Sequence, residues 1–108
     1  MDFEKLLKEL KADIVAEAKE KFGEEGKIIV SDMQEYLDSS KDKLKKWSML
    51  FVDGHIDKDE LAWLLKSQKD LLVMRGLVKL GVNKIKLGHF KNKVINIVFT
   101  KLVGLVVL

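Results

Sequence analysis

The sequence from Gly76 to Leu108, GLVKLGVNKIKLGHFKNKVINIVFTKLVGLVVL, decides how the rest of the chain must fold. This segment contains six lysines and no acidic residue, and its last fifteen positions are mostly apolar. A chain in water must hide most of such an apolar surface. We therefore expect the segment to be covered by the rest of the chain, by a second molecule or by a membrane interface.

The composition favours one all-α domain over residues 1–108. That length is enough for a single hydrophobic core. The chain has no proline, which interrupts helices, and it is rich in lysine, leucine and glutamate, which are good helix formers. It also has no cysteine, which excludes disulfides, thiol catalysis and cysteine-based metal sites.

Apolar side chains recur at three- and four-residue steps, which predicts a small four-helix bundle. The expected helices span residues 2–22, 32–50, 58–80 and 83–107. Valine and isoleucine crowd the end of the last segment, and a strand there is the alternative interpretation. Because strict alternation of apolar and polar residues is missing, we favour a helix.

Several polar residues stand where helix caps are expected. Asp2 and Asn83 precede the first and last helices, and Ser31 with Gln34 matches a capping box for the second. Gln68 interrupts the apolar stripe of the third helix, where it is either a buried polar group or an exposed one.

The segment FVDGHIDKDEL at residues 51–61 resembles the second half of an EF-hand calcium loop. When the two are aligned on Gly54, however, the first two ligand positions fall on Met49 and Phe51. Calcium needs six to eight oxygen ligands, which these apolar side chains do not supply. We therefore interpret the segment as a turn followed by a helix that Asp57 caps, with an acidic residue at the third helical position.

No residue pattern indicates an enzyme. His55 lies between Asp53 and Asp57, but the second histidine, His89, is more than thirty residues away. The chain contains no nucleophile motif, no glycine-rich phosphate loop and no paired-histidine metalloprotease motif. We predict no catalytic residue, no metal site and no cofactor.

Charge is distributed unevenly along the chain. Residues 1–40 carry 11 acidic and six basic side chains, whereas residues 41–108 carry 14 basic and six acidic ones. Such a chain can bind anionic partners through its basic part, or dock head to tail in a homo-oligomer. The residues that we expect to face an anionic partner are Lys84, Lys86, Lys91 and Lys93.

These patterns predict a protein that works by association. The expected interface uses the apolar residues of the C-terminal half, namely Leu72, Met74, Leu77, Val78, Val98, Leu102 and Leu105. The expected partner is a second copy or another protein.

One alternative is a peripheral membrane protein anchored by the C-terminal amphipathic helix. The other is a sequence-independent nucleic-acid binder, which is less favoured because the chain has a single arginine. Because the N-terminus resembles no signal peptide, we expect a cytoplasmic location, at most peripheral to a membrane.

Overall fold

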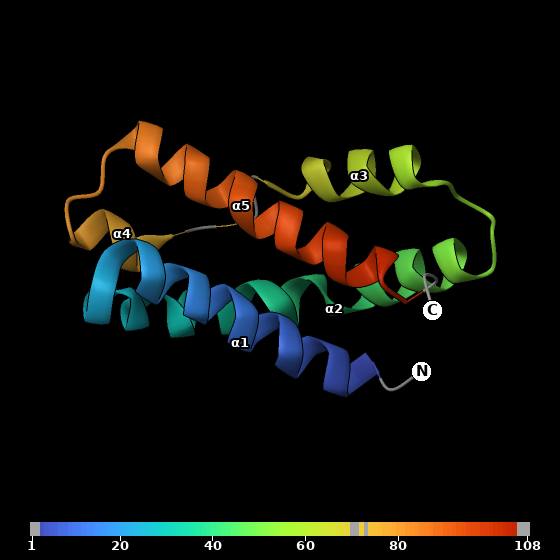
Figure 1. The fold of residues 1–108 in the computed structure, drawn as a ribbon, viewed down its shortest axis with the longest axis horizontal. Helices are drawn as coiled ribbons and strands as arrows, with labels where there is room; N and C mark the ends of the chain where they lie inside the picture. The colour runs from blue at the N-terminus through green and yellow to red at the C-terminus, as the bar shows by residue number, and fades with distance from the viewer. Residues whose placement is uncertain (1–2, 70–71, 73, 106–108) are drawn as a thin grey trace.

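The first half of the chain folds back on itself while it stays helical. The computed structural model describes residues 3–69, 72 and 74–105. Helix α1 (Phe3–Phe22) leads into the 3-10 helix η1 (Gly23–Ile29), which continues directly into α2 (Val30–Val52). Gly23 ends α1 with a φ of 71°, a left-handed conformation that favours glycine. Figure 1 shows the resulting hairpin, with α1 and α2 side by side and η1 at the turn.

The hairpin turn closes tightly because Gly26 has no side chain. A Cβ atom placed on Gly26 would lie 2.5 Å from the carbonyl oxygen of Ala18 on α1. Both residues are buried, and Ala18 is itself small. The backbone of η1 therefore packs directly against the backbone of α1.

The capping box predicted between Ser31 and Gln34 is wrong. Helix α2 begins at Val30 as a continuation of η1, so it has no free N-terminus that a side chain could cap. The Gln34 side chain instead accepts a hydrogen bond from Lys11 Nζ at 2.7 Å and donates one to Asp38 Oδ1 at 2.8 Å. These contacts link the exposed sides of α1 and α2. The Asp2 cap that the sequence predicts lies outside the described residues.

The predicted cap of the third helix is confirmed. Gly54, with a φ of 79°, forms the turn after α2, and helix α3 (Lys58–Ser67) follows. Asp57 Oδ1 accepts a hydrogen bond from the Glu60 amide at 2.8 Å, and Glu60 Oε1 accepts one from the Asp57 amide at 3.3 Å. Each side chain therefore satisfies a backbone donor at the start of α3.

The prediction of one helix over residues 58–80 is wrong. Helix α3 ends at Ser67, and a short helix α4 (Arg75–Lys79) forms separately. Leu72 and Met74, which lie between them, are buried in the core although they are not helical. Gly76 packs against Ile28 of η1 and donates its amide hydrogen to Asp32 Oδ2 at 2.9 Å. Interruption of the helix between α3 and α4 loses helical hydrogen bonds, but it allows α4 to dock on η1.

The apolar C-terminal segment forms helix α5 (Lys84–Val103), and its apolar side is covered by the chain itself. Asn83 caps this helix as predicted, because its Oδ1 accepts the Lys86 amide hydrogen at 2.9 Å. Helix is thus confirmed over 94–103, whereas 104 and 105 form a turn and 106–107 lie outside the described residues. Figure 1 shows α5 running between α3 and α1. Its buried residues are Phe90, Val94, Ile95, Val98 and Leu102.

Two contacts hold α5 against α1. The rings of Phe22 and Phe90 meet edge to face, with centroids 5.5 Å apart. Near the other end of α5, Lys101 Nζ lies 3.2 Å from Asp13 Oδ2 and 3.3 Å from Glu9 Oε2. The hydrogen bond that Lys101 donates to Asp13, assisted by the one to Glu9, raises the pKa of Lys101 above its ordinary value. These ion pairs therefore join α5 to α1 near the C-terminal end of α5.

The core contains a few polar side chains. Ser48 Oγ donates to the carbonyl oxygen of Leu44 at 2.6 Å, whereas the buried oxygens Tyr36 Oη, Ser40 Oγ and Gln68 Oε1 have no hydrogen-bond partner among the described residues. Burial raises the pKa of Tyr36, and the nearby Ser40 hydroxyl lowers it in part. Of the two positions that the sequence allows for Gln68, the buried one is observed.

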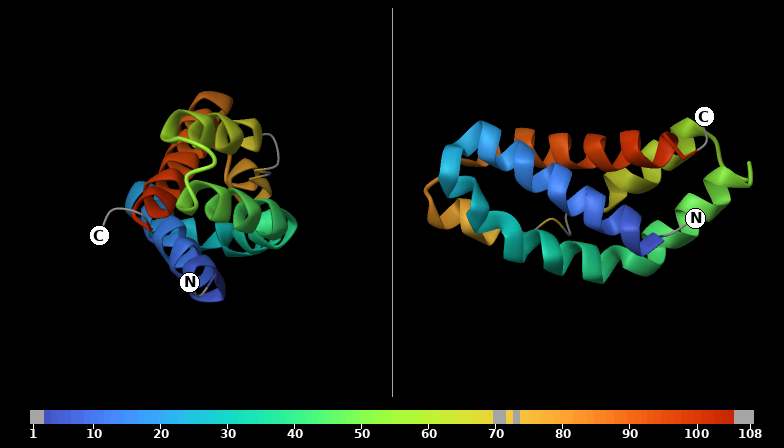
Figure 2. Two further views of the ribbon diagram at one scale, coloured as in Figure 1. Left: turned by 90° about the vertical axis from the view of Figure 1, so that its right-hand side faces the viewer. Right: turned by 60° about the horizontal axis from the view of Figure 1, so that its bottom comes forward.

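The molecule is elongated, with extents of 42 × 24 × 23 Å. One end is formed by η1, α4 and the turn that leads into α5, and the chain begins and ends at the other (Figures 1 and 2). Within the residues that the structure describes, no helix is both long and apolar enough to span a bilayer.

Candidate interaction surface

Exposed aliphatic side chains lie on α4, on the turn after it and on the first turn of α5. Ile85 is 72% exposed, Val78 is 60% exposed and Leu80 is 37% exposed. Large aliphatic side chains are expensive to leave in water, and they face it here although the core lies close by. This end of the molecule is therefore a candidate binding surface.

Cationic side chains are frequent on the same elements. Arg75 and Lys79 lie on α4, and Lys84, Lys86 and Lys91 lie on α5. We call these five cations, together with Met74, Val78, Leu80, Ile85 and Leu87, the α4–α5 surface. The sequence has no acidic residue from position 71 onward, so this surface carries basic and apolar groups only.

A groove of about 440 Å³ runs between α4 and α5 within this surface. Its lining residues are Met74, Arg75, Val78, Lys79, Leu87 and Lys91. The floor of the groove is apolar and its charged groups are all cations. A segment or chain that enters it would therefore need an apolar body and an anionic group.

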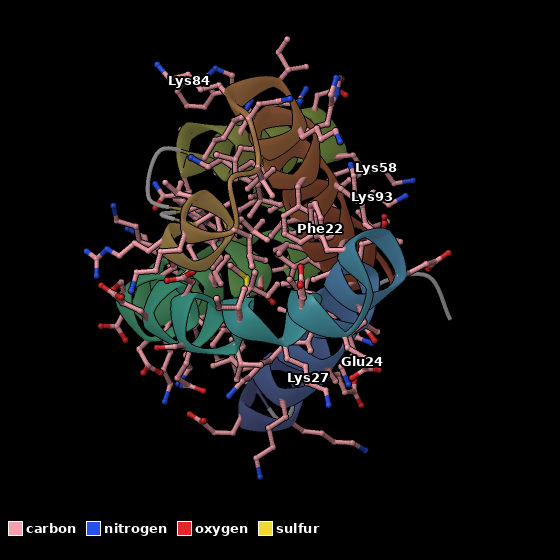
Figure 3. The ribbon with its side chains drawn as sticks, turned by 90° about the vertical axis from the view of Figure 1, so that its left-hand side faces the viewer. Phe22, Glu24, Lys27, Lys58, Lys84 and Lys93 are labelled. Atoms are coloured by element: carbon pink, nitrogen blue, oxygen red, sulfur yellow. The ribbon has the colours of Figure 1, made fainter. Side chains whose placement is uncertain are left out.

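Acidic residues at this end of the molecule lie on η1 and α2. Lys27 and Glu24 of η1 form an ion pair at 3.0 Å, and Arg75 Nη1 reaches Glu35 Oε2 of α2 at 3.7 Å. Figure 3, which views this end directly, places Lys27 and Glu24 on the side opposite to Lys84. The charge of the end therefore changes from mixed at η1 to purely basic at α5.

The structure places the predicted interface residues in two groups. Val78 is exposed on α4, and Leu105 is half-buried near the end of α5. The other five are buried inside the chain's own core; they are Leu72, Met74, Leu77, Val98 and Leu102. Of the predicted set, Val78 and Leu105 therefore present most of the surface that a second molecule could contact.

The four lysines predicted to face an anionic partner are also divided. Lys84, Lys86 and Lys91 belong to the α4–α5 surface, whereas Lys93 lines a separate groove between α3 and α5. Ile85 is not among the residues predicted from the sequence, although it lies between two lysines and off the apolar stripe of α5. The sequence does contain a signal for Ile85, because it is an apolar residue that lies off the buried stripe at the start of a capped helix.

The part of the chain that the structure describes holds no cluster of histidine and acidic side chains that could bind a metal ion. No protein-family model, curated protein or solved structure matches the chain. The inference about function therefore rests on the α4–α5 surface and on the grooves of the molecule.

Proposed function

We propose that the protein works by association, and that it binds an anionic membrane surface peripherally through the α4–α5 surface. The observation that carries this proposal is that exposed aliphatic side chains and several cations occur together on α4 and the first turns of α5, at one end of an elongated molecule. A bilayer with anionic headgroups offers negative charge for the cations and an acyl layer for the aliphatic side chains. This differs from the anchor expected from the sequence, because the apolar side of α5 is already buried.

The magnitudes indicate that charge and apolar contact are both required. A lysine or arginine near an anionic bilayer contributes about 1 kcal/mol, so three of them contribute about 3 kcal/mol. Moving the exposed parts of Val78 and Ile85 out of water contributes about 1–2 kcal/mol each. The sum, about 5–7 kcal/mol, corresponds to an association constant of roughly 10⁴–10⁵ M⁻¹. The electrostatic contribution alone, or the apolar contribution alone, would give only marginal binding.

A second copy of the chain is a poor partner for this surface. Two copies that met through it symmetrically would bring five cations against five cations. Charge does not favour head-to-tail docking on α1 either, because α1 carries five acidic and five basic residues and so has no net charge. The charge pattern therefore favours a partner that differs from the chain itself.

An acidic, apolar segment of another protein is the second candidate partner, in line with the association expected from the sequence. The observation that favours it is the groove between α4 and α5, whose apolar floor and cationic rim suit an amphipathic helix with acidic residues. A bilayer would use the exposed tips of Val78 and Ile85, whereas a helix would use the groove floor at Leu87.

The test is sedimentation of the full chain with vesicles of phosphatidylcholine, with and without phosphatidylserine. We expect binding to the anionic vesicles only, and weaker binding as salt rises. The double variant Val78→Ser/Ile85→Ser should bind at least tenfold more weakly. Lys84→Gln/Lys86→Gln should bind more weakly by a similar factor.

The matched control is Met49→Ser/Val52→Ser, which removes side chains that are 50% and 46% exposed on α2. This control should bind as the unaltered chain does. If the chain fails to sediment with anionic vesicles, membrane binding is refuted. If the control variant loses as much binding as Val78→Ser/Ile85→Ser, the assignment to the α4–α5 surface is refuted.

A further inference from the structure

A second groove, about 760 Å³ in volume, lies between α3 and α5 and is separate from the α4–α5 surface. Its lining residues are Ala62, Lys66, Lys69, His89, Asn92, Lys93, Ile95, Asn96 and Phe99. This volume falls within the usual range for small-molecule sites. The groove exists because Ala62 is small where α3 faces α5, while Phe99 forms a half-buried wall.

The charged side chains that line this groove are all cations, as they are in the groove between α4 and α5. The lining of the α3–α5 groove includes three lysines from two elements and no carboxylate. Two lysines outside this groove form ion pairs with acidic residues of another helix, Lys41 with Glu4 and Lys101 with Asp13. None of the groove lysines has an acidic partner among the residues that the structure describes.

The helix dipole explains the positions of only some of the three lysines. Lys66 lies in the last turn of α3, where a cation interacts favourably with the helix dipole, and Lys69 follows shortly after. Lys93 lies in the middle of α5 and has no such role. It borders both this groove and the acidic groove between α1 and α5, yet it forms no ion pair with the carboxylates there. Three lysines that line one groove without a carboxylate give it a positive potential, which favours the binding of an anion.

The remaining lining residues narrow the class of anion. The side-chain amides of Asn92 and Asn96 carry both donors and acceptors, which suit the hydroxyl groups and ring nitrogens of a polar ligand. Ile95, Ala62 and Phe99 add an apolar floor on which a flat ring could lie. Lysine ammonium groups are common ligands of phosphate.

We propose that the α3–α5 groove binds a small phosphate-bearing ligand of nucleotide size. Its phosphate groups would contact Lys66, Lys69 and Lys93, and its ring would lie against Phe99. This site goes beyond the membrane association proposed above, since it uses different residues.

The test is titration of the isotopically labelled full chain, followed by NMR, with adenosine triphosphate, inorganic triphosphate and adenosine at constant ionic strength. We expect adenosine triphosphate to shift the amide signals of residues 62–69 and 89–99. Adenosine alone should bind at least tenfold more weakly, because it lacks the phosphates. Inorganic triphosphate should bind with an affinity between those two.

The variants localise the site. Lys66→Gln/Lys93→Gln should weaken binding of adenosine triphosphate at least tenfold. Lys43→Gln/Lys46→Gln, which removes the same charge from the exposed side of α2, should change it by less than twofold. Phe99→Leu should weaken binding of adenosine triphosphate but leave inorganic triphosphate unchanged.

Three results would overturn the proposal. The first is the absence of any shift at millimolar adenosine triphosphate. The second is an equal loss of binding in the two double-lysine variants, which would indicate unspecific attraction. The third is binding of a twelve-residue oligothymidylate more than a hundredfold tighter than adenosine triphosphate, with shifts that extend beyond this groove. That result would make nucleic acid the ligand. None of these outcomes depends on whether the chain binds vesicles.

Discussion

Replacing Gly26 by alanine tests whether the hairpin of α1, η1 and α2 is as tightly closed as the structure indicates. The added Cβ atom would lie 2.5 Å from the carbonyl oxygen of Ala18, 2.6 Å from its carbonyl carbon and 2.8 Å from the Lys19 nitrogen. These are all backbone atoms, so no side chain can rotate out of the way. Ordinary contact begins near 3.4 Å, which requires η1 to move away from α1 by about 0.9 Å.

The magnitude follows from two opposing effects. Overpacking of a closed interior costs about 1–3 kcal/mol, and the upper part of that range applies because the contacts are with backbone. Alanine gains about 0.5–1 kcal/mol over glycine, because it restricts the unfolded chain. We therefore expect Gly26→Ala to lower the free energy of unfolding by about 1–2 kcal/mol. The melting temperature should fall by roughly 5–15 °C.

Gly88→Ala is the matched control. Gly88 lies within α5, and a Cβ atom there would meet nothing within 4 Å, so this substitution should raise stability by about 0.5–1 kcal/mol. Urea unfolding followed by circular dichroism at 222 nm measures both variants. If Gly26→Ala is as stable as the unaltered chain, or if both variants change stability in the same direction, the close approach of η1 to α1 is refuted.

Two further substitutions test other parts of the fold. Tyr36→Phe removes a buried hydroxyl that makes no hydrogen bond of standard geometry and has the Ser40 hydroxyl nearby, so thermal unfolding should show unchanged stability or a gain of up to about 1 kcal/mol. A loss above about 1 kcal/mol would mean that Tyr36 and Ser40 form a stabilising hydrogen bond. Asp57→Ala removes the cap of α3 and should lower the free energy of unfolding, measured in urea, by about 1 kcal/mol. Asp59→Ala, in the same turn but without a capping hydrogen bond, should lower it much less. Equal losses in the two variants would contradict the capping role of Asp57.

The sequence was most informative where a local rule determines the structure. Asp57 and Asn83 cap their helices because a side-chain oxygen of the residue before the first turn satisfies a nearby amide in any fold. The spacing of Phe90, Val94 and Val98 likewise predicted α5 and its buried side, since apolar periodicity reports directly on helix faces.

The sequence was least informative where tertiary contacts decide. Nothing between Gln68 and Met74 resembles a helix breaker, and the apolar residues there fit a continuous helix as well as an interrupted one. The break arises because α4 docks on η1 at Ile28 and on α2 at Asp32, which accepts a hydrogen bond from Gly76, 44 positions further along the chain. Which apolar residues stay exposed depends on the same docking. The α4–α5 surface could therefore not be recognised from the apolar pattern alone.

The position of α5 also has a consequence for synthesis of the chain. The hairpin of α1 and α2 is complete once Val52 has left the ribosome, but the helix that covers its apolar side ends only at Val103. At a translation rate of about 5–20 residues per second, the intervening roughly 50 residues take about 3–10 s. During that interval the growing chain carries an uncovered apolar surface, which is the kind of surface that chaperones recognise.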